Sequence, residues 1–283
     1  MNRRRFLTRA LQSTAGVLCL PRTELTASAL MPGRLSSIGM QLYTVRRELE
    51  KDFGGTLARV AALGYREVEF AGYFNRPPKE VRGLLDRHRL KSPAAHVPLV
   101  ALRGNLQEMI DAAHLIGHKY LLVAYLPAEE RRSLDDYRRH ADLFNKAGEL
   151  LNKAGLRFAY HNHDFEFAPT GGRVPYDLLL ELTDPRLVKM EMDLYWTVKG
   201  GASPLKYFEK HPGRFHLLHV KDMDATPKRY FTEVGRGVID FKTVFAGAGR
   251  AGVRHYFVEQ DETPGPPFDS LKVSMDYLKK LEF

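Results

Sequence analysis

Cysteine is almost absent from this chain. Among 283 residues only Cys19 is a cysteine, and it lies in an N-terminal segment that we expect to be cleaved. A lipid anchor on Cys19 is not expected, because Leu18 stands where a lipoprotein signal has a small residue. The mature chain would then contain no thiol, which excludes disulfides, thiolate nucleophiles and cysteine-based metal sites. Nitrogen and oxygen remain as the metal ligands that the sequence offers.

Blocks of like charge are also missing from the expected mature chain. The formal net charge is +9, and residues 1–29 hold five arginines against one glutamate, so their removal lowers it to +5. The arginine pairs at 131–132 and 138–139 are interleaved with Asp135 and Asp136, as on a solvated helix face. We therefore expect no nucleic-acid partner.

The first 29 residues have the three-part pattern of a twin-arginine signal peptide. Arg3-Arg4-Arg5-Phe6-Leu7 precedes a weakly apolar stretch from Ala10 to Leu20 and a small-residue exit at Ala27-Ser28-Ala29. The apolar stretch is too short for a permanent membrane span. We expect cleavage after Ala29, export by the twin-arginine (Tat) machinery and a periplasmic mature protein. A basic N-terminus without a targeting role is the alternative.

Short apolar, β-rich runs alternate with helical patterns along the rest of the chain. The expected strands are Ile38–Tyr43, Glu67–Phe70, Ser92–Val97, Tyr120–Ala124, Arg157–Asn162, Val188–Asp193, Phe215–Val220 and Tyr256–Gln260. The expected helices include Thr56–Leu63, Leu106–Ile116, Leu134–Lys153 and Phe241–Ala251, each with a glycine just past its end.

Eight strand–helix units in about 250 residues are typical of a closed barrel. We predict an α/β fold, a single (β/α)₈ TIM barrel over residues 30–283, and not an open doubly wound sheet. No glycine-rich phosphate loop follows the first expected strand, which further weakens a dinucleotide-binding interpretation.

Four expected strands end in clusters of imidazole and carboxylate groups. These clusters are Tyr160–Glu166, Glu191–Asp193, His219–Asp222 and Glu259–Glu262. Residues two apart share a face of a strand, which pairs His161 with His163, Glu191 with Asp193, and Glu259 with Asp261. Such groups at the ends of successive barrel strands predict a divalent-metal site on the rim. Salt bridges from Asp193 and Glu259 to Lys221 or an arginine are the structural alternative.

With these motifs in place, the chain resembles the sugar phosphate isomerase/epimerase family of the xylose-isomerase-like TIM barrel superfamily. The resemblance covers nearly all of the mature chain and rests on Gly39–Arg46, Val68–Gly72, Tyr160–Phe167, Glu191–Trp196, His219–Asp222, Gly235–Phe241 and Val258–Asp261, in this order. It implies one divalent metal ion. We expect Mn²⁺, with Zn²⁺, Mg²⁺, Co²⁺ or Fe²⁺ as alternatives. The ion would be held by a Glu, an Asp, a His and a Glu from the fifth to eighth strands.

Carried over by position, Asp193, His219 and Glu259 fill the last three places of this ligand set. The chain departs from the family at the first place, where His161 stands and many relatives carry glutamate. Either Glu166 folds back to supply the fourth ligand, or an imidazole from His161 or His163 does so. We expect Glu166.

Further polar and aromatic residues point toward the same rim. Gln41 and His96 end the first and third expected strands, and Trp196 is the only tryptophan. We take these three and Glu191 as candidate substrate-binding residues. For Trp196, core packing is an equally good interpretation, and Glu191 fits a deeper position in which it orients a ligand histidine. Lys221 is either a substrate-binding cation or the partner of Glu191.

The resemblance implies metal-assisted proton transfer next to a carbonyl, as in sugar isomerisation or epimerisation. Because export places the protein where phosphorylated sugars are scarce, we expect a non-phosphorylated sugar or keto-sugar. Glu259, His161, His163 and Lys221 are the candidate catalytic residues. A 3-keto-glycoside lyase or hydratase, an inosose-type dehydratase and a non-catalytic carbohydrate-binding barrel remain as alternatives. The sequence leaves open whether the chain forms an oligomer.

Overall fold

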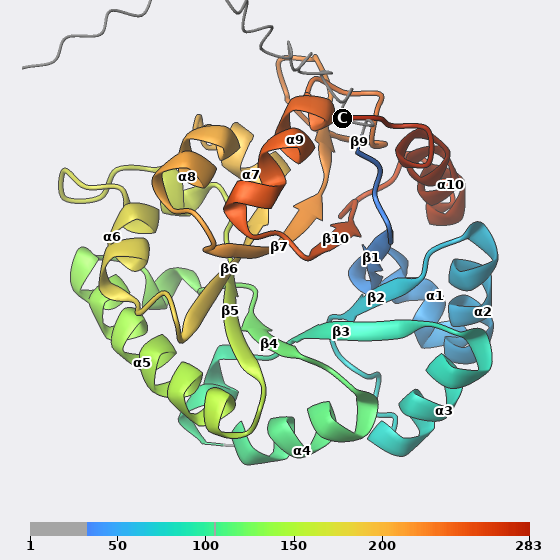
Figure 1. Ribbon diagram of the computed structural model, residues 1–283, viewed down its shortest axis with the longest axis horizontal. Coiled ribbons are helices and arrows are strands. Elements are labelled where there is room, and N and C mark those ends of the chain that lie inside the picture. The colour runs from blue at the N-terminus through green and yellow to red at the C-terminus, as the bar shows by residue number, and fades with distance from the viewer. Residues whose placement is uncertain (1–32, 105) are drawn as a thin grey trace, which may run out of the picture. The chain divides into compact units, whose positions relative to one another are not determined.

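The computed structural model describes residues 33–104 and 106–283 (Figure 1). The expected signal peptide at residues 1–29 lies outside the described residues. Within the described residues, no helix combines the length and the apolar character that crossing a bilayer requires.

Eight parallel strands close into a barrel, as the sequence predicts. In chain order they are β1 (Gly39–Gln41), β2 (Glu67–Phe70), β3 (Lys91–His96), β4 (Tyr120–Val123), β5 (Arg157–His161), β6 (Val188–Asp193), β7 (Phe215–Val220) and β10 (His255–Val258). Around the barrel the order is β1-β10-β7-β6-β5-β4-β3-β2, and β2 pairs again with β1. Since every pairing is parallel, all eight C-terminal strand ends meet at one end of the barrel.

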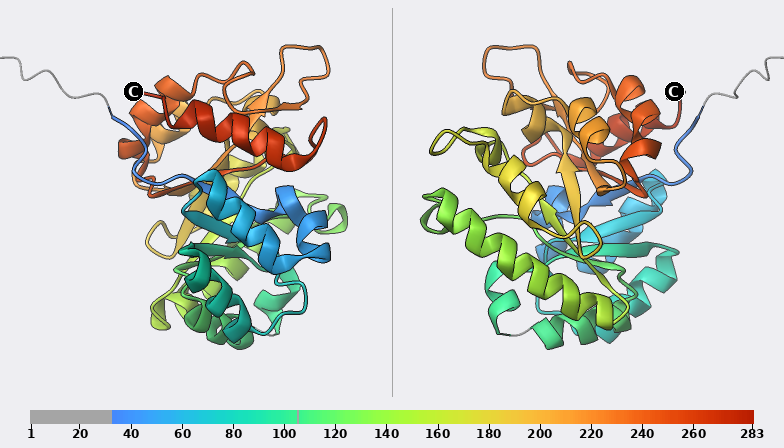
Figure 2. Two further views of the ribbon diagram at one scale, coloured as in Figure 1. Left: turned by 90° about the vertical axis from the view of Figure 1, so that its right-hand side faces the viewer. Right: turned by 60° about the vertical axis from the view of Figure 1, so that its left-hand side comes forward.

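Helices surround the strands on the outside (Figures 1 and 2). They are α1 (Arg46–Lys51), α2 (Phe53–Leu63), α3 (Pro78–His88), α4 (Leu106–Ile116), α5 (Leu134–Lys153), α6 (Pro175–Leu182), α7 (Leu194–Lys199), α8 (Pro204–Lys210), α9 (Phe241–Ala251) and α10 (Pro267–Leu278). Four of them match the expected helices, and α2 begins earlier than predicted because the Asp52 side chain caps it by accepting from the Gly55 N–H.

The first and last barrel strands are shorter than predicted. After β1 the chain turns at once into a 3₁₀ helix (Leu42–Val45), whose first turn is capped by the Gln41 side chain accepting from the Tyr43 N–H. After Val258 the chain leaves the sheet, so Glu259 and Gln260 follow β10 instead of ending it. Polar side chains thus stand at the end of β1, with Gln41, and just beyond β10, with Glu259 and Gln260.

The barrel interior is layered because side chains two apart on a strand share a face. An apolar cluster contains Ala94, Ala159 and Leu217, on β3, β5 and β7. Two residues further along the same strands stand His96, His161 and His219. The apolar layer is thus followed by a polar layer at the C-terminal strand ends.

A short antiparallel pair, β8 (Asp222–Met223) with β9 (Phe231–Thr232), follows β7. The buried Asp222 carboxylate accepts from the N–H groups of Met223, Gly235, Gly237 and Ile239, at 2.8, 2.9, 3.0 and 3.2 Å. A Cβ at Gly237 would lie 2.2 Å from the Met223 carbonyl oxygen, so only glycine allows this approach. We call residues 222–240 the β8–β9 excursion. Asp222, part of a predicted ligand cluster, anchors this excursion.

Candidate metal centre and active site

Four buried side chains meet at the C-terminal strand ends. His161 ends β5, Asp193 ends β6, His219 lies near the end of β7, and Glu259 follows β10. One ligand atom from each lies within 4.8 Å of the others, so these four can hold a metal ion. We call them the upper group.

Asp193 shows how the local sequence aims one ligand. It is the N-cap of α7, and its Oδ1 accepts from the Trp196 N–H at 2.8 Å. The Asp193 N–H donates to the Asn162 side chain at 3.2 Å, which ties the ends of β5 and β6 together. Its second oxygen is left to face His161 Nε2 at 3.3 Å and Lys221 Nζ at 3.1 Å.

A second group lies deeper and shares His219 with the first. Glu69, His96, Glu191 and His219 also offer ligand atoms within 4.8 Å of one another. Glu69 Oε2 accepts from Gln41 Nε2 at 2.7 Å and lies 2.7 Å from His219 Nε2. Glu191 Oε2 lies 3.1 Å from the same nitrogen and 3.3 Å from His96 Nε2. We call Gln41 and these four residues the lower group.

His219 therefore stands between two sets of carboxylates. Its Nε2 faces Glu69 and Glu191. Its Nδ1 lies 2.9 Å from a Glu259 oxygen, but this nitrogen makes no hydrogen bond. Carboxylates that accept from Nε2–H would leave the Nδ1 lone pair free for a metal ion. Glu191 thus lies in the deeper position that the sequence analysis also considered, in contact with His219.

Gln41 and Glu191, two of the candidate substrate-binding residues, lie below the upper group. Both side chains are fully buried, and Glu191 lies two residues before Asp193 on β6, hence one layer deeper. His96 is partly exposed but points into the same lower group, where Glu69 and Glu191 raise its pKa to about 9 against the lowering effect of burial. These three residues support the upper group from below.

Glu69 is the functional candidate that the sequence analysis missed. It is fully buried and makes the shortest contact to His219 in the lower group. Its segment, Glu67-Val-Glu-Phe70, has the same alternation of apolar and acidic residues as the clusters that were recognised. A single carboxylate at the end of one strand is a weak signal by itself, and its meaning depends on barrel closure.

Lys221 lies among the upper carboxylates and is almost fully buried. Its Nζ is 3.1 Å from Asp193, 2.7 Å from Glu259 and 3.0 Å from Asp261. Burial alone would lower the pKa of Lys221, but these three carboxylates raise it well above its usual value. Lys221 is thus a permanent cation that pairs with Asp193 and Glu259, and not with Glu191.

The buried negative charge favours the binding of a divalent cation. Glu69, Glu191, Asp193 and Glu259 are buried, whereas Lys221 is the only lysine that contacts any of them within the described residues. Buried carboxylates are costly unless cations compensate them. Burial alone would lower the pKa of His219, but Glu191 and Glu259 raise it well above its usual value. An ion at Nδ1 would replace that proton.

Glu166, the predicted fourth ligand, lies outside the upper group. Its carboxylate accepts from the Tyr160 hydroxyl and, at 2.8 Å, from the His163 N–H. Because Phe165–Phe167 forms a 3₁₀ turn, Glu166 caps the backbone three residues before it and belongs to neither group. His161 occupies the place in the upper group that was expected for Glu166.

His163 and Trp196 stand beside the upper group. The His163 ring stacks on Phe165, is 5.0 Å from His161 and is 5.3 Å from Trp196, measured between ring centroids. Its Nδ1 is buried without a hydrogen-bond partner, and burial holds the pKa of His163 well below its usual value. His163 is therefore neutral and carries an unpaired ring nitrogen.

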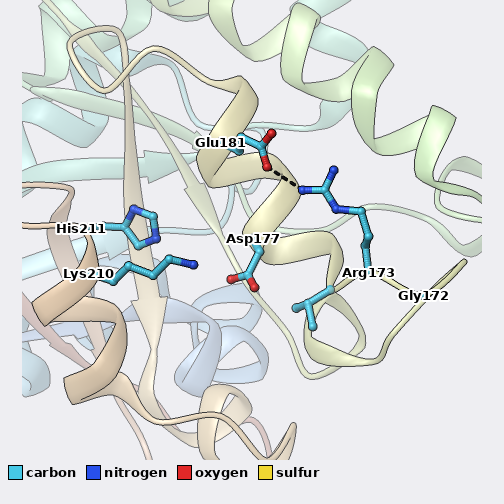
Figure 3. Close-up of a pocket in the computed structure, with 7 residues that line it drawn as sticks. Gly172, Arg173, Asp177, Glu181, Lys210 and His211 are labelled. Carbon is cyan, nitrogen blue, oxygen red and sulfur yellow. Dashed lines mark hydrogen bonds and ion pairs between the residues drawn. The ribbon is translucent and has the colours of Figure 1, made fainter.

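A surface hollow on the barrel flank lies apart from this chemistry. It is lined by Gly172, Arg173, Val174, Asp177, Glu181, Lys210 and His211, from α6, the loop before it and the end of α8 (Figure 3). Arg173 pairs with Glu181 on the α6 side of the hollow. None of its lining residues belongs to the upper or lower group, so the strand ends remain the candidate site.

Known proteins resemble this chain over most of its length. The family model described as xylose isomerase-like TIM barrel matches residues 57–281. An inosose dehydratase from Geobacillus kaustophilus is 24% identical, with 80% of this chain and 86% of the relative covered. The crystal structure of a sugar phosphate isomerase/epimerase from Parabacteroides distasonis is 28% identical with a TM-score of 0.77, covering 88% of this chain and 99% of that one.

A more distant structure with the same fold contains a metal. The IOLI protein, solved with a bound zinc atom, has a TM-score of 0.67 and 13% identity, covering 85% of this chain and 95% of that one.

Proposed function

Because this chain belongs to the xylose isomerase-like TIM barrel family, a family of sugar isomerases, epimerases and inosose dehydratases, we propose that it transfers a proton next to the carbonyl of a non-phosphorylated sugar or keto-sugar. A divalent metal ion would assist this step. The observation that carries the proposal is the upper group, in which two imidazoles and two carboxylates converge at the C-terminal strand ends. In barrels of this type that end carries the active site.

His161, Asp193, His219 and Glu259 would hold the ion. Two nitrogen and two oxygen donors suit Mn²⁺, our first choice, or Zn²⁺, the metal of the IOLI protein. A bound divalent ion withdraws electron density from a carbonyl oxygen and so acidifies the neighbouring C–H bond. The unpaired Nδ1 of His219 supports this assignment.

Two residues beside the ligands have the properties that proton transfer needs. His163 has an unpaired Nδ1 beside His161 and is the candidate proton acceptor. The Lys221 ammonium, held between Asp193, Glu259 and Asp261, would stabilise negative charge that develops on the sugar oxygen. Glu259, whose carboxylate contacts both Lys221 and His219, is the candidate base on the opposite side.

Solvent-deuterium exchange into ketoses and keto-glycosides, combined with metal analysis, tests the proposal. We expect exchange in the metal-loaded protein, with about one ion per chain, and loss of the ion in Asp193→Ala and His219→Ala. His163→Asn should retain the ion and lose about 10²–10⁴ in exchange rate. Glu166→Gln, whose carboxylate lies outside the upper group, is the matched control and should retain both. Sugar binding without exchange in the loaded protein would favour the non-catalytic barrel.

An inosose-type dehydratase is the second candidate, because curated relatives carry that name. The same proton abstraction next to a ketone would be followed by loss of the β-hydroxyl group as water. Mass spectrometry separates the two, since isomerisation conserves mass and dehydration removes one water. A product lighter by one water from an inosose would support this second candidate.

We also propose that the protein is exported through the twin-arginine route and acts in the periplasm. Arg3-Arg4-Arg5 and the Ala27-Ser28-Ala29 exit support this proposal. Folding before transport would allow the ion to bind inside the cell.

A further inference from the structure

Aromatic side chains follow one another along the C-terminal ends of β4, β5, β6 and β7, which are neighbours in the barrel. They come from the loop after β4, the loop after β5, helix α7 and the β8–β9 excursion. We call them the aromatic arc: Tyr125, His163, Phe165, Trp196, Tyr230 and Phe231.

Neighbouring rings of the aromatic arc are in contact. Between centroids, Tyr125 lies 5.3 Å from His163, and His163 lies 5.3 Å from Trp196. Trp196 lies 5.7 Å from Phe231, which in turn lies 5.0 Å from Tyr230. The two ends are exposed, with Tyr125 at 48% and Tyr230 at 46%. The arc is therefore several rings long and open at both ends.

The middle of the arc adjoins the upper group. Lys221 Nζ lies 5.6 Å from the ring centroids of both Trp196 and Phe231, and it contacts Asp193 and Glu259 on its other side. The indole Nε1 of Trp196 is buried without a hydrogen-bond partner. Aromatic walls beside a few convergent polar groups are typical of small-molecule sites.

Hydrogen bonds between side chains and the backbone hold the arc in shape before any ligand binds. Asp222 anchors the excursion that carries Tyr230 and Phe231. The Tyr195 hydroxyl donates to the Arg229 carbonyl at 2.8 Å, and the Arg229 guanidinium donates to the Val198 carbonyl at 2.7 Å. These bonds join the excursion to α7, so little conformational freedom would be lost on binding.

Next to β1, the same end of the barrel carries an exposed tyrosine that does not belong to the aromatic arc. Tyr43 follows β1 and is 42% exposed, but the Arg46 guanidinium lies over its ring, 4.1 Å from the centroid. Arg46 is itself paired with Glu262 at 2.8 Å. Tyr43 thus provides an exposed tyrosine at the same end of the barrel, outside the arc.

We propose that the aromatic arc binds a second ring of the substrate, so that the preferred substrate is a glycoside and not a free monosaccharide or cyclitol. The inference rests on the proposed function, which places the carbonyl-bearing sugar at the upper group. The exposed ends of the arc, Tyr125 and Tyr230, lie beyond the inner rings His163 and Phe231. The C–H face of a second pyranose packs flat on aromatic rings, whose faces carry partial negative charge.

The sole tryptophan makes binding directly measurable, because Trp196 lies in the arc and is the only tryptophan in the chain. Metal-loaded protein would be titrated with lactulose and isomaltulose, which are keto-disaccharides, and with fructose, the matched keto-monosaccharide. We expect a saturable change in tryptophan emission, with both disaccharides binding about 10-fold or more tighter than fructose. Equal affinities, or no binding of either disaccharide, would overturn the proposal.

Two variants at the exposed ends of the arc locate the second ring. Tyr125→Ala or Tyr230→Ala should weaken disaccharide binding about 3- to 10-fold and leave fructose binding unchanged. Tyr43→Ala is the matched control and should change neither, with circular dichroism verifying the fold of all three. An equal loss in Tyr43→Ala, or no loss in both arc variants, would overturn the assignment.

Binding and chemistry give separate readouts here. Tight, arc-dependent disaccharide binding without deuterium exchange into any sugar would contradict the proposed function and support the arc. Exchange into sugars with no preference for disaccharides would support the proposed function and contradict the arc.

Discussion

His219 faces different carboxylates at its two ring nitrogens. Glu69 and Glu191 face its Nε2, at 2.7 and 3.1 Å, and the upper group surrounds its Nδ1. Carboxylates behind a ligand histidine keep its proton on the far nitrogen and make the near nitrogen a better donor. Glu69 would therefore influence an ion bound at the upper group through His219, without being a ligand of the upper group.

Replacing Glu69 tests this positioning role. Glu69→Gln should weaken metal binding about 10- to 100-fold, because an amide accepts more weakly from Nε2–H than a carboxylate does. Isothermal titration with Mn²⁺ or Zn²⁺ measures the change.

Glu67→Gln is the matched control for Glu69→Gln. Glu67 lies two residues earlier on β2 and pairs with His255 Nδ1 at 2.9 Å, away from the upper group. Equal metal affinities in the two variants would contradict the role of Glu69.

Glu166 should make stability depend on pH. Burial raises the pKa of Glu166 to about 7, despite hydrogen bonds from Tyr160 and His163 that lower it. Because the folded pKa lies above the unfolded value, the native state retains a proton that the unfolded state loses between about pH 4.3 and 7. Its stabilising contribution, on the order of 3 kcal/mol, is present at low pH and is lost as the pH rises through 7.

Urea unfolding of the metal-free protein at pH 5 and pH 8 measures this effect. We expect the free energy of unfolding to fall between these pH values in the wild type, and to fall less in Glu166→Gln, whose amide does not titrate. The same pH dependence in both proteins would show that the Glu166 carboxyl titrates normally.

At the scale of elements, the β8–β9 excursion depends on one buried carboxylate. Asp222 accepts from four backbone N–H groups, one in β8 and three in the loop after β9. Asp222→Ala should lower the free energy of unfolding by on the order of 3 kcal/mol, because buried donors would lose their acceptor. Hydrogen exchange of the Gly235, Gly237 and Ile239 amides should become faster.

Asp224→Ala is the control within the same excursion. Asp224 also accepts from backbone N–H groups, those of Thr226 and Tyr230, but on the protein surface. We expect a change of less than about 1 kcal/mol there. Equal losses in the two variants would mean that burial of Asp222 is not what stabilises the excursion.

At the scale of the whole molecule, export is tested through the arginine run. Replacing Arg3, Arg4 and Arg5 with lysine conserves charge and removes the paired guanidinium groups that the export receptor would recognise. We expect the protein to be retained in the cytoplasm as the uncleaved chain, measured by fractionation and by mass spectrometry of its N-terminus. Periplasmic yield equal to the wild type would contradict the twin-arginine route.

The order of the barrel strands in the chain and the positions of several helices could be predicted because they depend on local rules. Alternating apolar side chains mark the strands, and caps mark the helices: α5 runs from Leu134 to Lys153 as expected, beginning at the Ser133 capping box. Glycines past the helices adopt left-handed conformations, with φ of 106° at Gly64 and 87° at Gly252. These signals depend only on residues that are close together in the chain, so they can be recognised without the tertiary structure.

The positions of His161, Asp193, His219 and Glu259 near strand ends also follow from the local pattern, since the strands are parallel and their ends meet. What each side chain faces depends on how the chain packs in three dimensions. Glu69 and His219 are 150 residues apart and touch because the barrel closes and both side chains point into it. Glu166, five residues after His161, turns away because a 3₁₀ turn directs its carboxylate to a backbone N–H. Strand periodicity specifies a face, whereas contacts across the barrel depend on register and closure, which no local pattern encodes.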